Sequence, residues 1–402
     1  MVAPVAREGG PSRWPGGGRG EAGAYVPAGS DSHVALLVKP HASAGSDLKS
    51  FFVTQNIVLI VNTLPIKFSC AIWQGGIVMA MTINYGVLLG FVPSNDSEVL
   101  LQSGQFEGVI RFRIVDMISG RVIIGYISGV KGLDSSGLSS SAAGWHCLFA
   151  GFRNVNDLVI SSVDNIQLDK SIENKYLGLE NGILDPSAIL LSRYGCLTFM
   201  DWQGLQHNLP KKCGYNTRVF ECKEAARALL HASGCEEASN ILRNVDSVVY
   251  EAHKCVLEEN LSRRAEHYFS EMKRVAKGEL ITCRDAWARG NLQELGQLIS
   301  ASGRSSILNY ECGSKEMIQL YEILLKAPGV LGARFSGAGF RGCCLAIVES
   351  DRAEEAAAYV AAEYEKAQPE LVSRIPANRR VLVCEPGDSA RVILPDGDRL
   401  RS

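Results

Sequence analysis

The chain has 402 residues, of which 46% are hydrophobic, so it is long enough for two domains that each bury a core of their own. Its formal net charge of −2 provides no electrostatic attraction to nucleic acid or to an anionic membrane, and a small-molecule or protein partner is therefore expected. The 12 cysteines are scattered without a paired CxxC spacing, which argues against a zinc site and favours burial in a reducing compartment.

The residue pattern of positions 1–73 does not predict a folded domain. Residues 1–50 are rich in Gly, Pro, Ser and Ala without a helical or strand period, which predicts disorder. The apolar run FFVTQNIVLIVNTLPI (51–66) carries Thr, Gln and two Asn and falls short of a membrane span. The N-terminus also lacks the apolar region of a secretory signal, so we expect a cytoplasmic protein without a transmembrane helix.

The pattern of apolar residues from Gln74 onward predicts a sheet of short strands followed by helices. The expected strands are residues 77–83, 87–92, 97–103, 108–116 and 122–129. Helical spacing follows at 221–234, 247–278 and 298–329, and a strand, an Ala-rich helix and a strand close the chain at 343–350, 353–368 and 380–387. This order predicts an α+β fold with a boundary near residue 209, so that residues 74–208 and 209–402 form two domains.

The stretch GLDSSGLSSSAAGWHCLF (132–149) has the pattern of a flexible loop that enters a helix. Gly137 permits close approach of a ligand, and the serines from Ser139 to Ser141 fall at the first helical turn, where N–H groups and the helix dipole favour an anion. These hydroxyls could cap the helix, bind phosphate or ligate a phosphate-bound Mg²⁺. Composition alone leaves a phosphate loop and a plain capping turn equally open. The loop is not a Walker A motif, because no Gly-Lys-Ser/Thr follows its glycines.

Two further segments match the order and approximate separation of motifs in one enzyme family. GARFSGAGFRGCC (332–344) is a Gly-rich loop that enters a strand, and GLENGILDPSAILL (178–191) contains Asp185. Together with the triple-serine loop they resemble the GHMP kinases. Within that family the chain is most similar to the galactokinase branch, and there to the plant galacturonokinases. The resemblance runs from Gln74 to the C-terminus.

This resemblance implies a two-domain GHMP-kinase fold, in which an N-terminal mixed α/β domain carries the phosphate-loop helix and the C-terminal domain is helical plus ferredoxin-like α/β. It also implies an ATP-dependent kinase that phosphorylates the anomeric hydroxyl of D-galacturonate, with ATP and Mg²⁺ as cofactors. We expect a monomer whose partner is a small sugar, without nucleic acid or membrane.

The resemblance also assigns roles to single residues. Asp185 is the implied catalytic base beside the reacting hydroxyl, Tyr215 lies near the sugar, and Arg218 completes a Tyr-x-x-Arg match. The implied ATP-binding residues are Gly137, Leu138, Ser139, Ser140, Ser141, Ala142, Gly337, Gly339 and Gly342, and the implied Mg²⁺ ligands are Ser141 and Glu173. Without the resemblance, Asp185 reads more simply as a turn residue and Glu173 as an exposed helix charge.

Several stretches depart from the family pattern. PIKFSCAIWQGG (65–76) replaces the charged first motif and has Ile72 where the sugar-binding Asp belongs, and segments are missing after Met117 and before Cys213. Pro186 stands where the family has Gln, which removes one backbone N–H. His146 is expected to be displaced or exposed. These departures leave two alternatives to a galacturonate kinase: a galactokinase-like enzyme for another hexose, or an inactive protein with a kinase fold.

Overall fold

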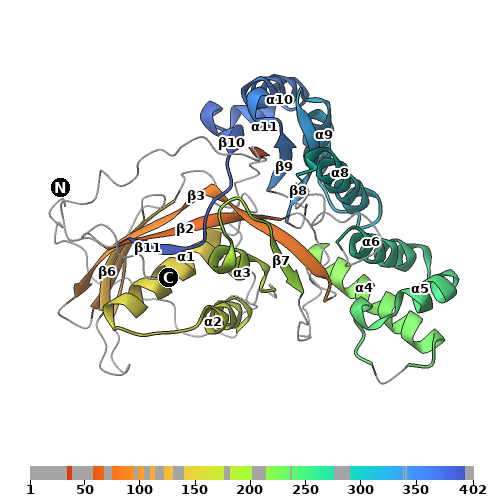
Figure 1. Cartoon of the computed structure of the whole chain (residues 1–402), viewed down its shortest axis with the longest axis horizontal. Helices are drawn as coiled ribbons and strands as arrows, with labels where there is room; N and C mark the ends of the chain where they lie inside the picture. Colours follow the sequence, from red (N-terminus) through yellow and green to blue (C-terminus); the bar gives the residue numbers. More distant parts are fainter. Residues whose placement is uncertain are drawn as a thin grey trace.

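The computed structural model describes most of the chain after residue 74 and two short strands before it. The described residues are 34–38, 58–67, 75–94, 98–103, 109–113, 122–129, 140–175, 182–201, 214–235, 238–275, 290–337, 339 and 342–393. They form two sheets with helices around them, which confirms the α+β class (Figure 1). None of the helices in these ranges is long and apolar enough to cross a membrane.

The larger sheet has seven strands in the order β11-β2-β3-β6-β4-β5, with β7 also paired to β3. Its strands are β2 (Val58–Lys67), β3 (Ile77–Ser94), β4 (Glu98–Ser103), β5 (Val109–Arg113), β6 (Val122–Gly129), β7 (Thr198–Asp201) and β11 (Arg391–Ile393). The strands predicted at 77–83 and 87–92 are one continuous strand, β3. Asn84 and Gly86 between them predicted a turn, but β2 runs along this segment with a register shift, and Asn84 N donates to Glu385 O (2.9 Å), so the segment stays extended.

The smaller sheet has four strands in the order β10-β1-β9-β8. They are β1 (Val34–Val38), β8 (Val330–Ser336), β9 (Cys343–Val348) and β10 (Val381–Cys384). Strand β1 pairs in parallel with both β9 and β10, so the prediction of disorder is wrong for residues 34–38. The run VALLV is too short to stand out within a Gly- and Pro-rich segment, yet a continuous apolar run suits a strand with neighbours on both edges.

The first and the last described strands each lie in a different sheet from the strand next to them in sequence. The N-terminal β1 belongs to the smaller sheet, whereas β11 near the C-terminus pairs antiparallel with β2 in the larger one. Ala390 N donates to Ile189 O on the way to β11 (2.8 Å). The division into domains at residue 209 stays a prediction.

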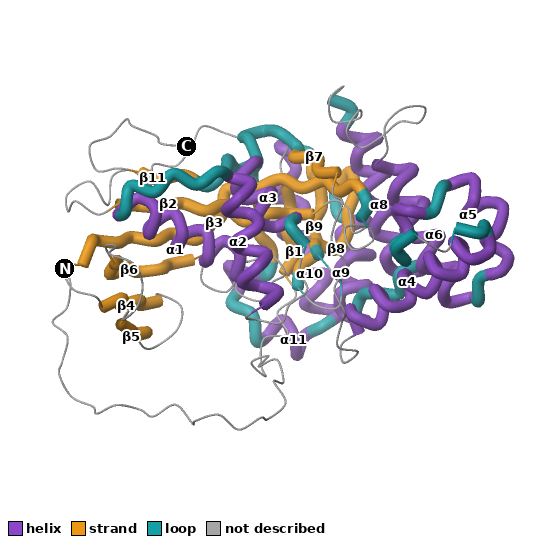
Figure 2. Tube along the Cα trace, turned by 90° about the horizontal axis from the view of Figure 1, so that it is seen from below, coloured by secondary structure: helices purple, strands orange, loops and turns teal. Residues whose placement is uncertain are grey.

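Helices cover both sheets in separate groups. The described helices are α1 (Ser140–Val155), α2 (Ser162–Lys175), α3 (Leu184–Leu191), α4 (Gly214–Ala232), α5 (Ser247–His253), α6 (Glu259–Val275), α8 (Leu292–Leu308), α9 (Lys315–Lys326), α10 (Ala353–Ala367) and α11 (Pro369–Ser373). Helices α1 and α3 pack on β2 and β3, while α8, α9 and α10 pack on the strands of the smaller sheet. Figures 1 and 2 show α4, α5 and α6 as a helical group at one end of the molecule.

Two long predicted helices are each interrupted. The segment 247–278 divides into α5 and α6, because the short 3₁₀ turn η4 (Lys254–Val256) separates them. The segment 298–329 divides into α8 and α9 at Glu311 (φ 50°) and Gly313 (φ 111°), which take left-handed backbone conformations. Ser314 then caps α9 by accepting a hydrogen bond from Met317 N.

Helix α8 contacts β8 backbone to backbone. A Cβ atom on Gly332 of β8 would overlap the carbonyl oxygen of Gly296, and a Cβ on Gly296 would overlap the backbone of Leu331. The two glycines therefore let the helix lie closer to the strand than side chains allow. This approach buries Leu295 and Ile299 of α8 completely.

A buried polar network lies between α6, α8 and β8. Arg334 is fully buried and donates to Ser302 Oγ (2.8 Å) and to the carbonyl of Phe335 (2.9 Å). Ser302 in turn donates to Glu271 (2.9 Å), which pairs with Arg274. Because a buried charge is costly without partners, these bonds hold β8 in place against both helices.

Two histidines are also buried. His146 of α1 is 2% exposed, so the expectation of an exposed side chain is wrong; Asp169 Oδ2 of α2 lies 4.0 Å from its Nε2. His267 hydrogen-bonds Ser305 Oγ through Nδ1 (2.9 Å). Burial lowers the pKa of each imidazole to about 4, which keeps both rings neutral at pH 7.

We predict that stability falls as the pH is lowered from about 6.5 to 4. In that window the unfolded chain binds protons at His146 and His267 while the folded chain does not, at a cost of up to about 3 kcal/mol for each. Urea titrations should show that His146→Gln and His267→Gln each flatten this dependence. His231→Gln, at an exposed position, is the control. Equal pH slopes for all four proteins would contradict the prediction.

We also predict opposite effects for two helical glycines. Gly296→Ala should lower the free energy of unfolding by roughly 1–3 kcal/mol, because its methyl group displaces α8 from β8. Gly144→Ala in α1 has open space around its Cβ and should be neutral or stabilising by up to about 1 kcal/mol. Denaturant unfolding of the pair measures both; a tolerated Gly296→Ala would show that close contact is not required.

Candidate active site

The triple-serine motif coincides with the start of a helix. Helix α1 begins at Ser140, so that Ser140, Ser141 and Ala142 form its first turn; Gly137, Leu138 and Ser139 lie outside the described residues. Ala143 and Cys147 behind this turn are fully buried in the core that includes β3. The predicted loop-to-helix transition is therefore confirmed from Ser140 onward, and the helix N-terminus directs its first N–H groups away from α1.

Asp185 also lies in the first turn of a helix. Helix α3 begins at Leu184, and Ser187 N donates to Ile183 O. Pro186 falls within the same turn, where a helix has no intrahelical acceptor for the backbone N–H. The substitution that looked unfavourable in the sequence therefore removes no helical hydrogen bond. Leu184 and Ala188 anchor the helix by packing with residues of β3.

The helices with Ser141, Glu173 and Asp185 form one layer. Glu173 lies in α2, and α2 packs on both α1 and α3, which also contact each other. In Figure 1 these three helices occupy the same side of the larger sheet. The fold thus gathers the implied catalytic residue and the implied Mg²⁺ ligands on neighbouring elements.

The third motif is the turn between β8 and β9. Ser336 pairs with Cys343 at the end of this hairpin, and Gly337, Gly339 and Gly342 have φ values of 84°, 78° and 111°. These left-handed conformations favour glycine. Cys343 belongs to the same hydrophobic cluster as Ala143 and Cys147 of α1, so the residue after the turn and the first part of α1 share one core.

An arginine from the helical group fixes the turn before β3. Arg243, in the 3₁₀ turn η3 (Leu242–Asn244), donates through Nη1 to the carbonyl of Gly75 (2.6 Å) and to Asp201. The hydrogen bond to Asp201 raises the pKa of Arg243 further. Gly75 belongs to the stretch 65–76 that replaces the first motif, and residues 68–74 of this stretch lie outside the described ranges. Sequence analysis missed Arg243, because its partners are distant along the chain.

The Tyr-x-x-Arg match lies in the first turns of α4. Tyr215 is the second residue of this helix, while Arg218 donates to Glu221 (3.0 Å) and to the carbonyl of Glu311 (3.3 Å). Arg264 of α6 is 1% exposed and bonds the same two glutamates at 2.6 Å each. Arg218 therefore belongs to an ion-pair cluster that joins α4, α6 and the turn after α8. Sequence analysis missed Arg264, whose pattern is that of a surface helix charge.

Comparisons with known proteins agree with these motifs. The family model for the GHMP kinases C terminal matches residues 283–366. Galacturonokinase from Arabidopsis thaliana is 51% identical, with 80% of this chain and 89% of that protein covered. Galactokinase from Lactobacillus helveticus is 28% identical over 79% of this chain and 90% of the relative. The alignment with the Arabidopsis protein is 384 positions long but contains only 80% of the 402 residues of this chain. The remaining positions are gaps in this chain, as expected if segments are missing from it.

A solved structure supports the fold. Lactococcus lactis galactokinase in complex with galactose superposes with a TM-score of 0.67 at 23% identity and covers 84% of this chain and 95% of its own. The predicted two-domain GHMP-kinase fold is thereby confirmed. Because a 51% identical relative is matched over 89% of its length, the chain belongs to the GHMP kinase family, in the group that contains galacturonokinase and the galactokinases.

Proposed function

We propose that the chain is an ATP-dependent sugar-1-kinase that phosphorylates the anomeric hydroxyl of D-galacturonate. The observation that carries the proposal is the 51% identity to the Arabidopsis galacturonokinase over 89% of that protein. The placement of Asp185 in the first turn of α3, against the helix that begins at Ser140, supports it. A carboxylate beside the hydroxyl is the group that phosphoryl transfer to a weak nucleophile requires.

The elements present fit ATP and Mg²⁺. The first backbone N–H groups of α1, which begins at Ser140, have no acceptor within the helix. The three positive-φ glycines of the β8–β9 turn have no Cβ, so the backbone there can approach a nucleotide closely. In this proposal residues from Gly137 to Ala142, with Gly337, Gly339 and Gly342, hold the nucleotide, while Ser141 and Glu173 hold Mg²⁺. Bound Mg²⁺ would neutralise negative charge on the phosphate oxygens.

The chain's own residues then have distinct tasks. The Asp185 carboxylate accepts the proton of the anomeric hydroxyl as this oxygen becomes the nucleophile, and Tyr215 lies near the sugar. Arg243 holds the turn at Gly75 by donating to its carbonyl. Gly75 belongs to the stretch 65–76, which stands where the family has its first motif. The buried core behind α1 and α3 keeps both helix starts fixed during the reaction.

The alternatives have less support. A kinase for another hexose would be nearer to the galactokinases, but the Lactobacillus helveticus enzyme is 28% identical against 51% for the galacturonokinase. An inactive protein remains the alternative suggested by the replaced first motif, with Ile72 outside the described residues. A cytoplasmic location and a monomeric state stay predictions.

The proposal predicts turnover with galacturonate that depends on Asp185. In a coupled assay with ATP, Mg²⁺ and galacturonate, glucuronate or galactose, we expect galacturonate to give the highest kcat/KM. Asp185→Asn should lower kcat at least about a hundredfold and retain nucleotide binding, because an amide cannot accept the proton. Asp164→Asn, in the first turn of α2, is the matched control. Absence of turnover with every sugar would favour the alternative of an inactive protein. Full activity of Asp185→Asn would show that Asp185 is not the catalytic base.

The Mg²⁺ assignment predicts a selective effect of Ser141→Ala. Loss of a hydroxyl ligand should weaken binding of the Mg²⁺ complex of ATP more than binding of Mg²⁺-free ATP, which calorimetry with and without the metal can measure. Ser161→Ala, which removes the hydroxyl that accepts from Asp164 N at the start of α2 (3.1 Å), controls for helix capping. Equal weakening of both nucleotide forms would indicate that Ser141 only supports its helix.

A further inference from the structure

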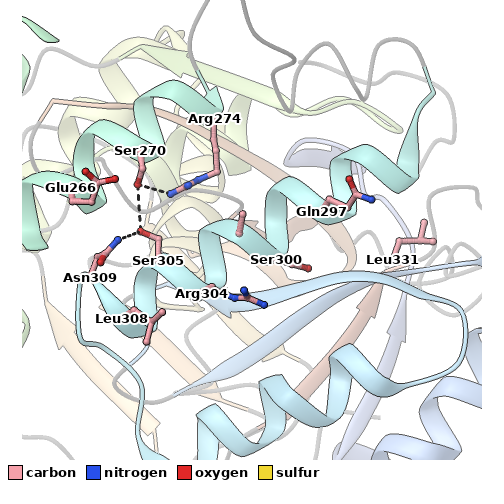
Figure 3. Close-up of a pocket in the computed structure, with 11 residues that line it drawn as sticks. Glu266, Ser270, Arg274, Gln297, Ser300, Arg304, Ser305, Leu308, Asn309 and Leu331 are labelled. Carbon is pink, nitrogen blue, oxygen red and sulfur yellow. Dashed lines mark hydrogen bonds between the residues drawn. The ribbon is translucent and has the colours of Figure 1, made fainter. Parts of the chain in front are cut away.

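A polar groove lies between α6 and α8, apart from the candidate active site. It encloses about 480 Å³ and is lined by successive turns of both helices (Figure 3). Leu331, at the start of β8, borders it, whereas the Gly-rich turn follows the other end of that strand. Five residues of extended chain lie between Leu331 and Gly337, so the two are six steps apart, a span of roughly 20 Å. The groove therefore differs from the proposed nucleotide site.

The lining combines two guanidinium groups with neutral hydrogen-bonding groups. Arg304 is exposed and forms a side-chain hydrogen bond with Tyr321 of α9, and none of the ion pairs found among the described residues includes it. Arg274 uses Nε and Nη2 for Glu271 and Ser270, while its Nη1 has no hydrogen-bond partner among the described residues. The neutral polar residues of the lining are Ser270, Gln297, Ser300, Ser305 and Asn309.

Two carboxylates lie at or near the groove, and each accepts a hydrogen bond. Glu266 lines the groove, and its carboxylate accepts a hydrogen bond from Tyr250 Oη (2.8 Å). Glu271 is buried and bonds Arg274 and Ser302. Arg304 has N–H donors beyond its bond to Tyr321, and Nη1 of Arg274 adds another, so donors remain for an anion from solvent. Arginine binds phosphate through paired N–H groups, and serine hydroxyls add further donors.

We propose that this groove binds a phosphorylated small molecule of sugar size. The phosphate contacts Arg304 and Arg274, and the hydroxyls of the ligand bond Gln297, Asn309 and the serines. A volume of about 480 Å³ lies within the range of small-molecule sites and suits a hexose phosphate. The inference does not rest on the proposed kinase function.

The groove is also connected to β8 through its floor. Ser305 lines it and bonds His267 beneath, and Arg274 shares Glu271 with Ser302, which accepts from Arg334 of β8. These hydrogen bonds join the floor of the groove to the strand that ends at the Gly-rich turn.

The test is calorimetry on the full chain with saturating ADP, using glucose 6-phosphate, glucose and inorganic phosphate as probes. We expect glucose 6-phosphate to bind at least tenfold more tightly than either part. Arg304→Gln should raise its Kd at least tenfold, whereas Arg227→Gln, an exposed arginine on α4 outside the groove, should not. Both side chains are exposed, so both variants are expected to fold.

A second variant separates shape from charge. Ala301 is an exposed residue of the lining, so Ala301→Phe fills the groove and keeps both arginines. It should abolish glucose 6-phosphate binding and leave the urea unfolding curve of the chain unchanged. Absence of binding to the wild-type chain, or an unchanged Kd in both Arg304→Gln and Ala301→Phe, would overturn the site. Inorganic phosphate binding as tightly as glucose 6-phosphate would overturn the sugar-sized ligand.

Discussion

The backbone contact between Gly296 of α8 and Gly332 of β8 is the constraint on which the C-terminal half depends. It sets the depth of α8 on the smaller sheet, and this depth brings Ser302 within reach of the buried Arg334. Arg334 then needs the Ser302–Glu271–Arg274 bonds, because a desolvated guanidinium without partners is costly. The close approach and the polar network therefore stabilise each other, and together they hold the strand that leads to the Gly-rich turn.

Much of the fold was accessible from local patterns. Strand β6 and helix α10 lie almost where their apolar spacing placed them, because each has one dominant period bounded by turn residues. The patterns failed where tertiary pairing decides. Asn84 and Gly86 continue β3 because β2 and the residue after β10, Glu385, bond to this segment, and β1 is ordered by neighbours more than 300 residues away in sequence.

The candidate site could be predicted as a set of motifs but not as a set of supporting contacts. Ser141 and Asp185 are found from short patterns, and both lie at helix starts. Arg243 and Arg264 act through Asp201, Glu221 and Glu311, and nothing in their local sequence indicates these partners. The buried His146 was misjudged for the same reason, since its burial depends on the packing of α2 against α1.

The distance along the chain between paired strands bears on synthesis of the protein. Strand β1 is synthesised about 300 residues before its partners β9 and β10. Until those strands emerge, this apolar segment cannot form the pairs that it makes in the smaller sheet, and closing so long a loop carries an entropic cost. The larger sheet likewise gains β11 only after β10 has been synthesised. Chaperone protection of the β1 segment during synthesis is therefore advantageous.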